Sequence, residues 1–104
     1  MAGVDYRAVR ELVAMGEVLD LLGLEPQSCV GTTWRGPCPL HGSHAPTSRS
    51  LEVHLGRKLF HCFRCGAAGN HLDLYAAVTR QRLYDAAVDL CGKLQRDVPW
   101  IQRW

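Results

Sequence analysis

Two short pairs of metal-ligating side chains stand out in this sequence. Cys38 and His41 enclose two residues, Cys62 and Cys65 also enclose two, and residues 42–61 separate the pairs. Zinc in proteins prefers four nitrogen or sulfur ligands at tetrahedral corners, and thiolate combined with imidazole suits it. The spacing therefore predicts one zinc ion per chain, held by these four residues. Because four protein ligands leave no open coordination position, the predicted role of the zinc is structural.

Other histidines and cysteines allow competing interpretations. His44 is a second candidate for the fourth ligand, although its five-residue gap from Cys38 makes a looser loop. Cys29 and Cys91 are interpreted as small buried apolar side chains, which is how free cysteine commonly behaves. His71 follows the second pair at the start of a predicted helix and is interpreted as a surface residue.

The second pair also has the form of a dithiol redox motif. Such motifs lie at a helix N-terminus directly after a strand, where the helix dipole lowers the thiol pKa. Here residues 66–69 delay the next helix to Asn70, and a second ligand pair lies upstream. The pattern therefore favours metal binding over redox exchange.

The elements that must position the ligands follow the order helix, sheet, helix over 104 residues. Asp5 is a predicted N-cap, Gly16 a predicted break between two short helices, and Gly23 a predicted left-handed helix end. Asn70 is a second predicted N-cap, and the last helix is expected to end near Gln95. We therefore expect one α+β domain over residues 1–104, with a helical segment over 5–23, a zinc-ribbon sheet over 29–69, a helical segment over 70–96 and a tail over 97–104.

Three short runs between the helical segments predict antiparallel strands. Residues 32–35 are β-branched and aromatic, and residues 50–55 alternate between polar and apolar side chains. Gly56 and Arg57 form a predicted turn, after which residues 58–63 return as the partner strand of a hairpin. A small antiparallel sheet between the two ligand pairs follows from this order.

Charge and composition limit the classes of function. The formal net charge is only +2, but residues 26–72 carry five basic and one acidic side chain, whereas residues 1–25 carry two basic and five acidic ones. A basic middle third can attract phosphate. No apolar run approaches the roughly 20 residues of a membrane-spanning helix. Five cysteines, an odd number, without a recognisable export signal indicate a reducing, cytoplasmic setting.

A face that could bind single-stranded nucleic acid follows from the predicted strands. Such binding combines cations that contact phosphates with aromatic side chains on which bases stack. Side-chain alternation places Phe60 and Cys62 toward the core, and Leu59, His61 and Phe63 on the opposite face. The candidate nucleic-acid-binding residues are Trp34, Arg35, Arg49, Arg57, Lys58, His61, Phe63 and Arg64.

Two stretches carry a resemblance to a known family. They are residues 35–41 (Arg-Gly-Pro-Cys-Pro-Leu-His) and residues 60–70 (Phe-His-Cys-Phe-Arg-Cys-Gly-Ala-Ala-Gly-Asn). With these, nearly the whole chain resembles the zinc-binding domain of bacterial DNA primases of the DnaG type. The resemblance implies a Cys-His-Cys-Cys zinc ribbon in an antiparallel sheet, with the ligands Cys38, His41, Cys62 and Cys65.

The same resemblance implies a function in DNA replication. In primases this module helps to engage the single-stranded template and to choose where primer synthesis starts. Single-stranded DNA is therefore the expected ligand, and a primase catalytic subunit or a helicase is a candidate partner. The polymerising centre of primases lies in a separate acidic domain, so we expect no catalytic centre in this chain.

The tail supports an alternative of a different class. Trp100, Ile101 and Trp104 place two tryptophans within five residues, and large apolar side chains are costly to expose. Either they fold back onto the core, or they anchor a partner protein or a second copy of the chain. In the alternative function the zinc is purely structural and this tail docks a protein.

Overall fold

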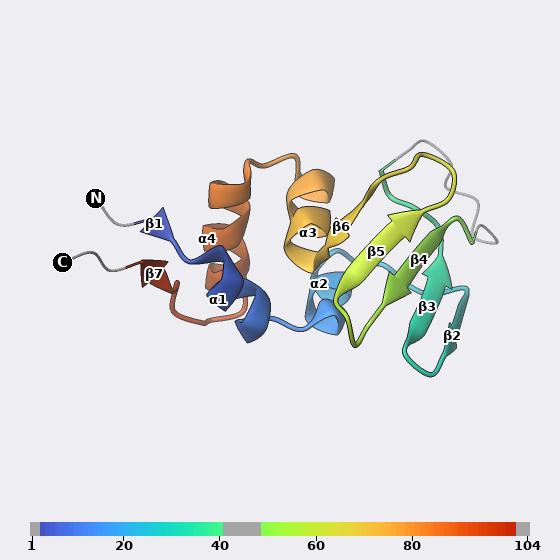
Figure 1. Cartoon of the computed structure of the whole chain (residues 1–104), viewed down its shortest axis with the longest axis horizontal. Coiled ribbons are helices and arrows are strands. Elements are labelled where there is room, and N and C mark those ends of the chain that lie inside the picture. The colour runs from blue at the N-terminus through green and yellow to red at the C-terminus, as the bar shows by residue number, and fades with distance from the viewer. Residues whose placement is uncertain (1–2, 41–48, 102–104) are drawn as a thin grey trace.

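The computed structural model describes residues 3–40 and 49–101. Its helices are α1 (Tyr6–Leu12), α2 (Met15–Leu21), α3 (His71–Thr79) and α4 (Leu83–Lys93). Its strands are β1 (Gly3–Val4), β2 (Ser28–Val30), β3 (Thr33–Gly36), β4 (Leu51–His54), β5 (Leu59–Cys62), β6 (Ala68–Asn70) and β7 (Trp100–Ile101). The molecule is elongated, 51 × 27 × 21 Å, with a five-stranded sheet at one end and β1 with β7 at the other (Figure 1). The expected α+β class is confirmed.

The N-terminal helical segment divides at a different place from the predicted one. Asp5 caps α1 as expected, its carboxylate accepting a hydrogen bond from the Ala8 N–H at 3.2 Å. The break falls at Val13 and Ala14, which have extended backbone, whereas Gly16 lies inside α2. The prediction of a break at Gly16 is therefore wrong, because burial of the Val13 side chain outweighs the low helix propensity of glycine.

The main sheet is antiparallel throughout and has the order β2-β3-β4-β5-β6. Its register aligns Trp34 of β3 with Val53 of β4, and Val53 with Phe60 of β5. The hairpin turn at Gly56 and Arg57 is confirmed, since His54 pairs with Leu59 across it. Strands β2 and β6 were not predicted, because each has three residues and no alternating pattern.

The C-terminal half contains the two predicted helices and β7, which pairs with β1 from the start of the chain. Asn70 caps α3, its side chain accepting from the Asp73 N–H at 2.9 Å, while the Asp73 carboxylate accepts from the Asn70 N–H at 3.0 Å. Helix α4 ends at Lys93, two residues before the predicted end. Within the described part of the chain, no helix has the length and apolar character that a bilayer crossing requires.

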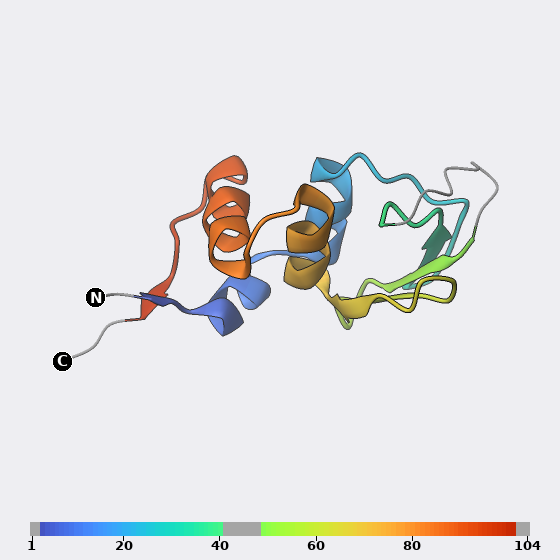
Figure 2. The same ribbon diagram turned by 90° about the horizontal axis from the view of Figure 1, so that it is seen from above.

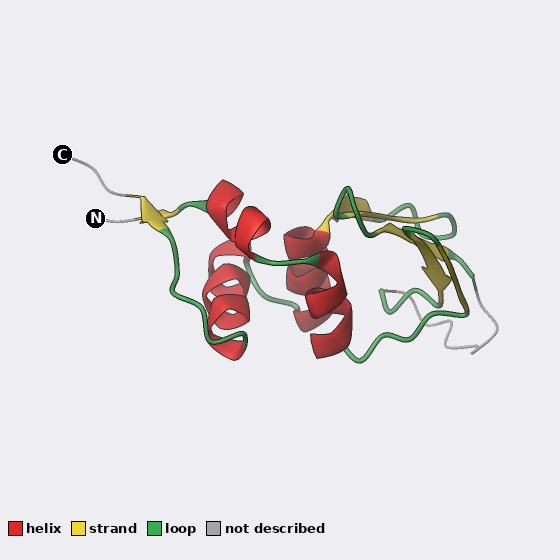
Figure 3. Cartoon of the chain, turned by 90° about the horizontal axis from the view of Figure 1, so that it is seen from below, coloured by secondary structure: helices red, strands yellow, loops and turns green. Residues whose placement is uncertain are grey.

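Two apolar clusters lie along the molecule, and α2 and α3 contribute to both. Val18 of α2 and Leu72 of α3 face the cluster formed with α1 and α4. Leu19 of α2 and Leu74 of α3 face the other cluster, under the sheet. Seen from above and from below, α2 and α3 lie between the main sheet and the other two helices (Figures 2 and 3). The sheet therefore has one face packed on helices and one face open to solvent.

An ion pair joins the beginning of α2 to the chain after α4. The Arg96 guanidinium donates to both carboxylate oxygens of Glu17, at 2.7 and 2.5 Å. The hydrogen bonds from Arg96 and from the Ala14 N–H lower the pKa of Glu17 from 4.5 to about 2. The ionised carboxylate is therefore the form that the folded chain stabilises.

We expect replacement of Glu17 by glutamine to lower Tm by about 2–5 °C at neutral pH, because a partly exposed ion pair contributes little. Since the folded pKa lies below the unfolded value, the contribution is complete above the unfolded pKa and is lost as the pH falls toward the folded one. The difference in stability between wild type and Glu17→Gln should therefore be constant down to about pH 5 and shrink below it. Urea unfolding followed by far-UV circular dichroism measures it, and a difference that grows on acidification would contradict the prediction.

Candidate metal centre and exposed sheet face

Three cysteine side chains converge at the edge of the second apolar cluster. The Sγ atoms of Cys38, Cys62 and Cys65 all lie within 4.8 Å of one another. All three are free thiols, and their separation suits a shared ion, because tetrahedral zinc with Zn–S near 2.3 Å places its sulfurs about 3.8 Å apart. The donor set and its spacing therefore fit zinc.

The backbone turns tightly around the sulfur of Cys38 and around that of Cys62. The Leu40 N–H donates to the Cys38 Sγ at 3.4 Å, and the N–H groups of Arg64 and Cys65 donate to the Cys62 Sγ at 3.4 Å. The Gly66 N–H closes the second turn on the Cys62 carbonyl at 3.0 Å, with glycine at φ +78°, where side chains are strained. Backbone donors thus point at sulfurs that become thiolates when a metal binds.

The two buried thiols differ in acidity. Burial raises the pKa of Cys38 to about 12. Burial acts in the same direction on Cys62, but hydrogen bonds from the Cys65 and Arg64 N–H groups and with the neighbouring thiols outweigh it and lower its pKa to about 6. Because the two sulfurs are neighbours, the charge of one thiolate opposes ionisation of the other, and the backbone hydrogen bonds of the second turn favour that first charge on Cys62.

The predictions for the other histidines and cysteines fare differently. His41 and His44 lie outside the described residues, so the fourth ligand stays a prediction. The expectation that Cys29 is buried is wrong, because it lies exposed on the short edge strand β2. The expectation for Cys91 is confirmed, since it is buried between the helices.

His71 was expected at the surface, and this is wrong because its side chain is 1% exposed. Its Nε2 lies 3.0 Å from the Arg10 carbonyl oxygen and 2.8 Å from the Val13 carbonyl oxygen, so Nε2 carries the proton and donates. Burial lowers the pKa of His71, which keeps the ring neutral. Its function is to hold the end of α1 against α3.

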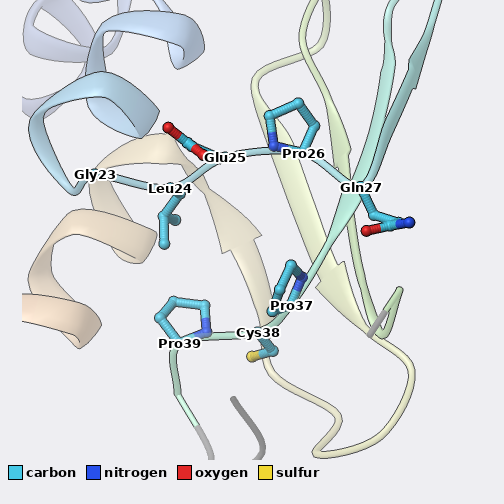
Figure 4. A pocket seen from close by; sticks show the side chains of 8 residues that line it. All are labelled: Gly23, Leu24, Glu25, Pro26, Gln27, Pro37, Cys38 and Pro39. Atoms are coloured by element: carbon cyan, nitrogen blue, oxygen red, sulfur yellow. The ribbon is translucent and has the colours of Figure 1, made fainter. Parts of the chain in front are cut away.

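A hollow of about 480 Å³ lies beside the metal centre. Two segments line it, residues 23–27 after α2 and residues 37–39 around Cys38, as Figure 4 shows. Pro37 and Pro39 flank Cys38 and restrict the backbone dihedral angle φ on either side of it. Among these lining residues, Glu25 is the only titratable group besides Cys38, so the hollow offers no paired groups for acid–base chemistry.

The solvent-facing side of the sheet carries a cluster of aromatic and basic side chains. The Arg35 guanidinium lies 5.1 Å from the centre of the Phe63 ring, and the His61 ring meets the same ring edge-on at 4.6 Å. Phe63 is 58% exposed, and Leu59 on the same strand face is also exposed. The predicted alternation along β5 is therefore confirmed.

Trp34 does not lie on this face, although the sequence places it among the candidate nucleic-acid-binding residues. Its side chain is only 4% exposed and packs in the cluster under the sheet, aligned with Val53. The proposal that Trp34 stacks on a base is therefore wrong. Alternation along β3 places Arg35 on the open face instead, where Glu52 and the Arg49 carbonyl oxygen hold its guanidinium.

Comparison with known proteins decides the family. A family model described as the CHC2 zinc finger, the zinc ribbon of DnaG, matches residues 7–103. The chain is a CHC2 zinc finger. Together with the three converging thiols, this membership establishes that the protein binds zinc.

DNA primases are among the relatives of this CHC2 zinc finger. DNA primase of Halalkalibacterium halodurans is 34% identical over 68 residues, which are 64% of this chain and 11% of the primase. DNA primase of Salmonella typhimurium is 24% identical over 93 residues, 88% of this chain and 16% of the primase. The crystal structure of the zinc-binding and RNA polymerase domains of Aquifex aeolicus primase superimposes with a TM-score of 0.73 at 22% identity, covering 92% of this chain and 23% of that one. The CHC2 zinc finger thus spans less than a quarter of the length of each of these primases.

Proposed function

We propose that this CHC2 zinc finger binds single-stranded DNA on the open face of its sheet during DNA replication, in the cytoplasm. It acts as a single domain without a catalytic centre of its own, beside a primase catalytic subunit or a helicase. One structural zinc, with the ligands Cys38, His41, Cys62 and Cys65, holds the sheet in shape. Membership of the DnaG zinc-ribbon family supports the assignment to replication.

The cluster of Arg35, His61 and Phe63 is the observation that carries the DNA-binding proposal. An aromatic ring that is 58% exposed and in contact with a guanidinium has no packing function in the core. A base can stack on such a ring, which the Arg35 guanidinium and His61 hold in place, while exposed cations nearby contact phosphates, and this combination is tolerant of sequence. The cluster therefore suits single-stranded rather than duplex nucleic acid, whose bases are already stacked.

Further cations border this cluster. Arg57 is exposed in the β4–β5 turn, and Arg64 is exposed in the second metal-binding turn. Arg49 donates to the Ser28 hydroxyl at 3.3 Å and lies at the opposite edge, near β2. With Lys58, these side chains would contact phosphates on either side of the stacked bases. Because few phosphates are contacted, binding should be weak and sensitive to salt.

The test is a titration of fluorescently labelled oligothymidylate with wild type and with Phe63→Ala. Stacking on an aromatic side chain contributes about 1–3 kcal/mol per base, so we expect Kd to rise about tenfold or more. Tyr84→Ala is the matched control, because Tyr84 is 46% exposed on α4, away from the sheet, and its removal should leave Kd unchanged. Equal Kd values for wild type and Phe63→Ala would overturn the proposal.

A second candidate function rests on the ribbon of β1 and β7. Val4 pairs with Trp100 and Gly3 with Ile101, so the tail returns to the chain start, while Trp104 lies outside the described residues. Trp100 is nevertheless 44% exposed, and its ring lies 6.2 Å from that of Tyr84. Such a patch could dock a partner protein or a second copy. Absence of DNA binding at low salt in the titration above would favour this docking function.

A further inference from the structure

A second hollow lies where α1, the β4–β5 turn and the start of α3 meet. Its volume is about 370 Å³, and four of the side chains that line it are cationic, namely Arg7, Arg10, Arg57 and Lys58. Glu11 is the only acidic side chain among the lining residues. Arg7 and Arg10 belong to the N-terminal segment, which has more acidic than basic residues. Only the fold brings these two arginines next to the β4–β5 turn of the main sheet.

Among the described residues, three of these four cations take part in no ion pair. Arg7 pairs with Glu11 at 3.5 Å, and both side chains are largely exposed. No ion pair among residues 3–40 and 49–101 includes Arg10, Arg57 or Lys58. Lys58 acts on the Glu17 carboxylate only through its field, without an ion pair. Three cations outside any ion pair in one concave surface repel one another and favour an anion between them.

The floor of the hollow is rigid. The Lys58 ammonium donates to the Arg10 carbonyl oxygen at 2.9 Å, and His71 donates to the same oxygen at 3.0 Å from beneath. Lys58 has the left-handed backbone conformation of a tight turn, with φ +57°, and this conformation sets the direction in which its side chain leaves the backbone. An ammonium group has three donors, so two remain for a ligand. The side chain is thus positioned by the protein before any anion arrives.

The hollow continues from the proposed DNA-binding face. A neighbouring depression of about 340 Å³ on the open side of the sheet is lined by His54 and His61, among others. Arg57 and Leu59 line both the depression and the hollow. A strand stacked along β5 toward the turn therefore passes Arg57 and arrives at Arg10 and Lys58.

We infer that this hollow binds a backbone phosphate of the single strand whose bases lie on the sheet, and that helix α1 is therefore part of the DNA interface. The inference rests on the proposed function, and it extends the proposed DNA interface from the main sheet to helix α1. Arg10 is the deciding residue, because it lies on α1 and takes no part in the open sheet face. Its side chain can be changed without loss of the backbone carbonyl that Lys58 and His71 bind.

The experiment compares wild type, Arg10→Gln and Arg82→Gln by titration of an oligothymidylate of about 12 nucleotides at about 50 and about 200 mM salt. Arg82 is the matched control, since it is a fully exposed arginine at the start of α4. For Arg10→Gln we expect Kd to rise about fivefold and the slope of log K against log salt to fall by about 0.7, the value of one phosphate contact on a single strand. Thermal melts equal to wild type would show that the fold is intact.

The outcomes separate the two proposals. If Arg10→Gln matches wild type in Kd and salt slope while Phe63→Ala still weakens binding, the hollow is not a phosphate site and the proposed function stands. If wild type does not bind the oligonucleotide, both proposals fail. A parallel titration with thymidine monophosphate identifies the source of the phosphate, because tight binding that Arg10→Gln abolishes would assign the hollow to a free nucleotide and overturn the strand assignment.

Discussion

Replacing Cys65 by serine should abolish zinc binding and unfold the sheet. Cys65 is exposed, so the change of one atom leaves no cavity in the core, and any large loss of stability has to come from the metal. Structural zinc contributes about 10–16 kcal/mol of apparent binding free energy in small peptides, which is comparable to or above the stability of a whole domain. Elemental analysis of the purified protein and a thermal melt measure the two effects.

The loss should be concentrated around the metal centre. Cys38 and Cys62 are fully buried in the cluster under the sheet, which contains Leu51, Val53 and Phe60 and which the metal-binding turns close at one edge. The other cluster packs α1, α3 and α4 without any of the three thiols. Amide hydrogen exchange should therefore rise first and most in β3, β4 and β5 when zinc is removed by a chelator.

Cys29→Ser is the matched control for this prediction. Cys29 is also an exposed cysteine, on β2, but its sulfur is not part of the cluster of three. We expect one zinc per chain and an unchanged Tm for this variant. Retention of one tightly bound zinc and a wild-type melt in Cys65→Ser would contradict the assignment of Cys65 as a ligand.

The parts of the fold that the sequence predicts well are those set by local chemistry. Asp5 and Asn70 cap their helices because a short side-chain acceptor reaches an N–H three residues later, and no distant part of the chain is needed. The sulfur of Cys62 in the second pair accepts hydrogen bonds from two backbone N–H groups of the same turn, those of Arg64 and Cys65. The β4–β5 hairpin follows from alternation and a tight turn between its strands.

The parts that the sequence does not predict depend on which residues the fold brings together. Trp34 belongs to a strand with both an aromatic and a basic side chain, and only its alignment with Val53 and Phe60 assigns it to the core. His71 is buried because two carbonyl groups at the end of α1, 58 or more residues away, accept its hydrogen bonds. The same packing of α1 against α3 places Arg10 beside Arg57 and Lys58 of the β4–β5 turn.

Gly69→Ala should destabilise the fold strongly, although Gly69 lies outside the metal centre. A Cβ atom at this position would lie 2.6 Å from a carboxylate oxygen of Asp73 and 2.9 Å from its Cβ, closer than real contacts allow. Asp73 cannot move away freely, because its carboxylate accepts the Asn70 N–H in the cap of α3. The variant therefore combines overpacking, about 1–3 kcal/mol, with loss of part of a helix cap, about 1 kcal/mol. Urea unfolding measures the sum.

The cause can be isolated by a second substitution at the contact. In Gly69→Ala/Asp73→Gly both the carboxylate and the Cβ atom that the new methyl group would meet are absent, so the double variant should be less destabilised than the sum of the two single variants. Gly56→Ala is the control, since a Cβ atom there meets only His54, at 3.7 Å, and should cost little. Additive effects of Gly69→Ala and Asp73→Gly would show that the glycine at position 69 is required for another reason. The absence of a side chain at position 69 thus allows β6, which follows the second metal-binding turn, to continue directly into the capped start of α3, and this links the zinc centre to the helices.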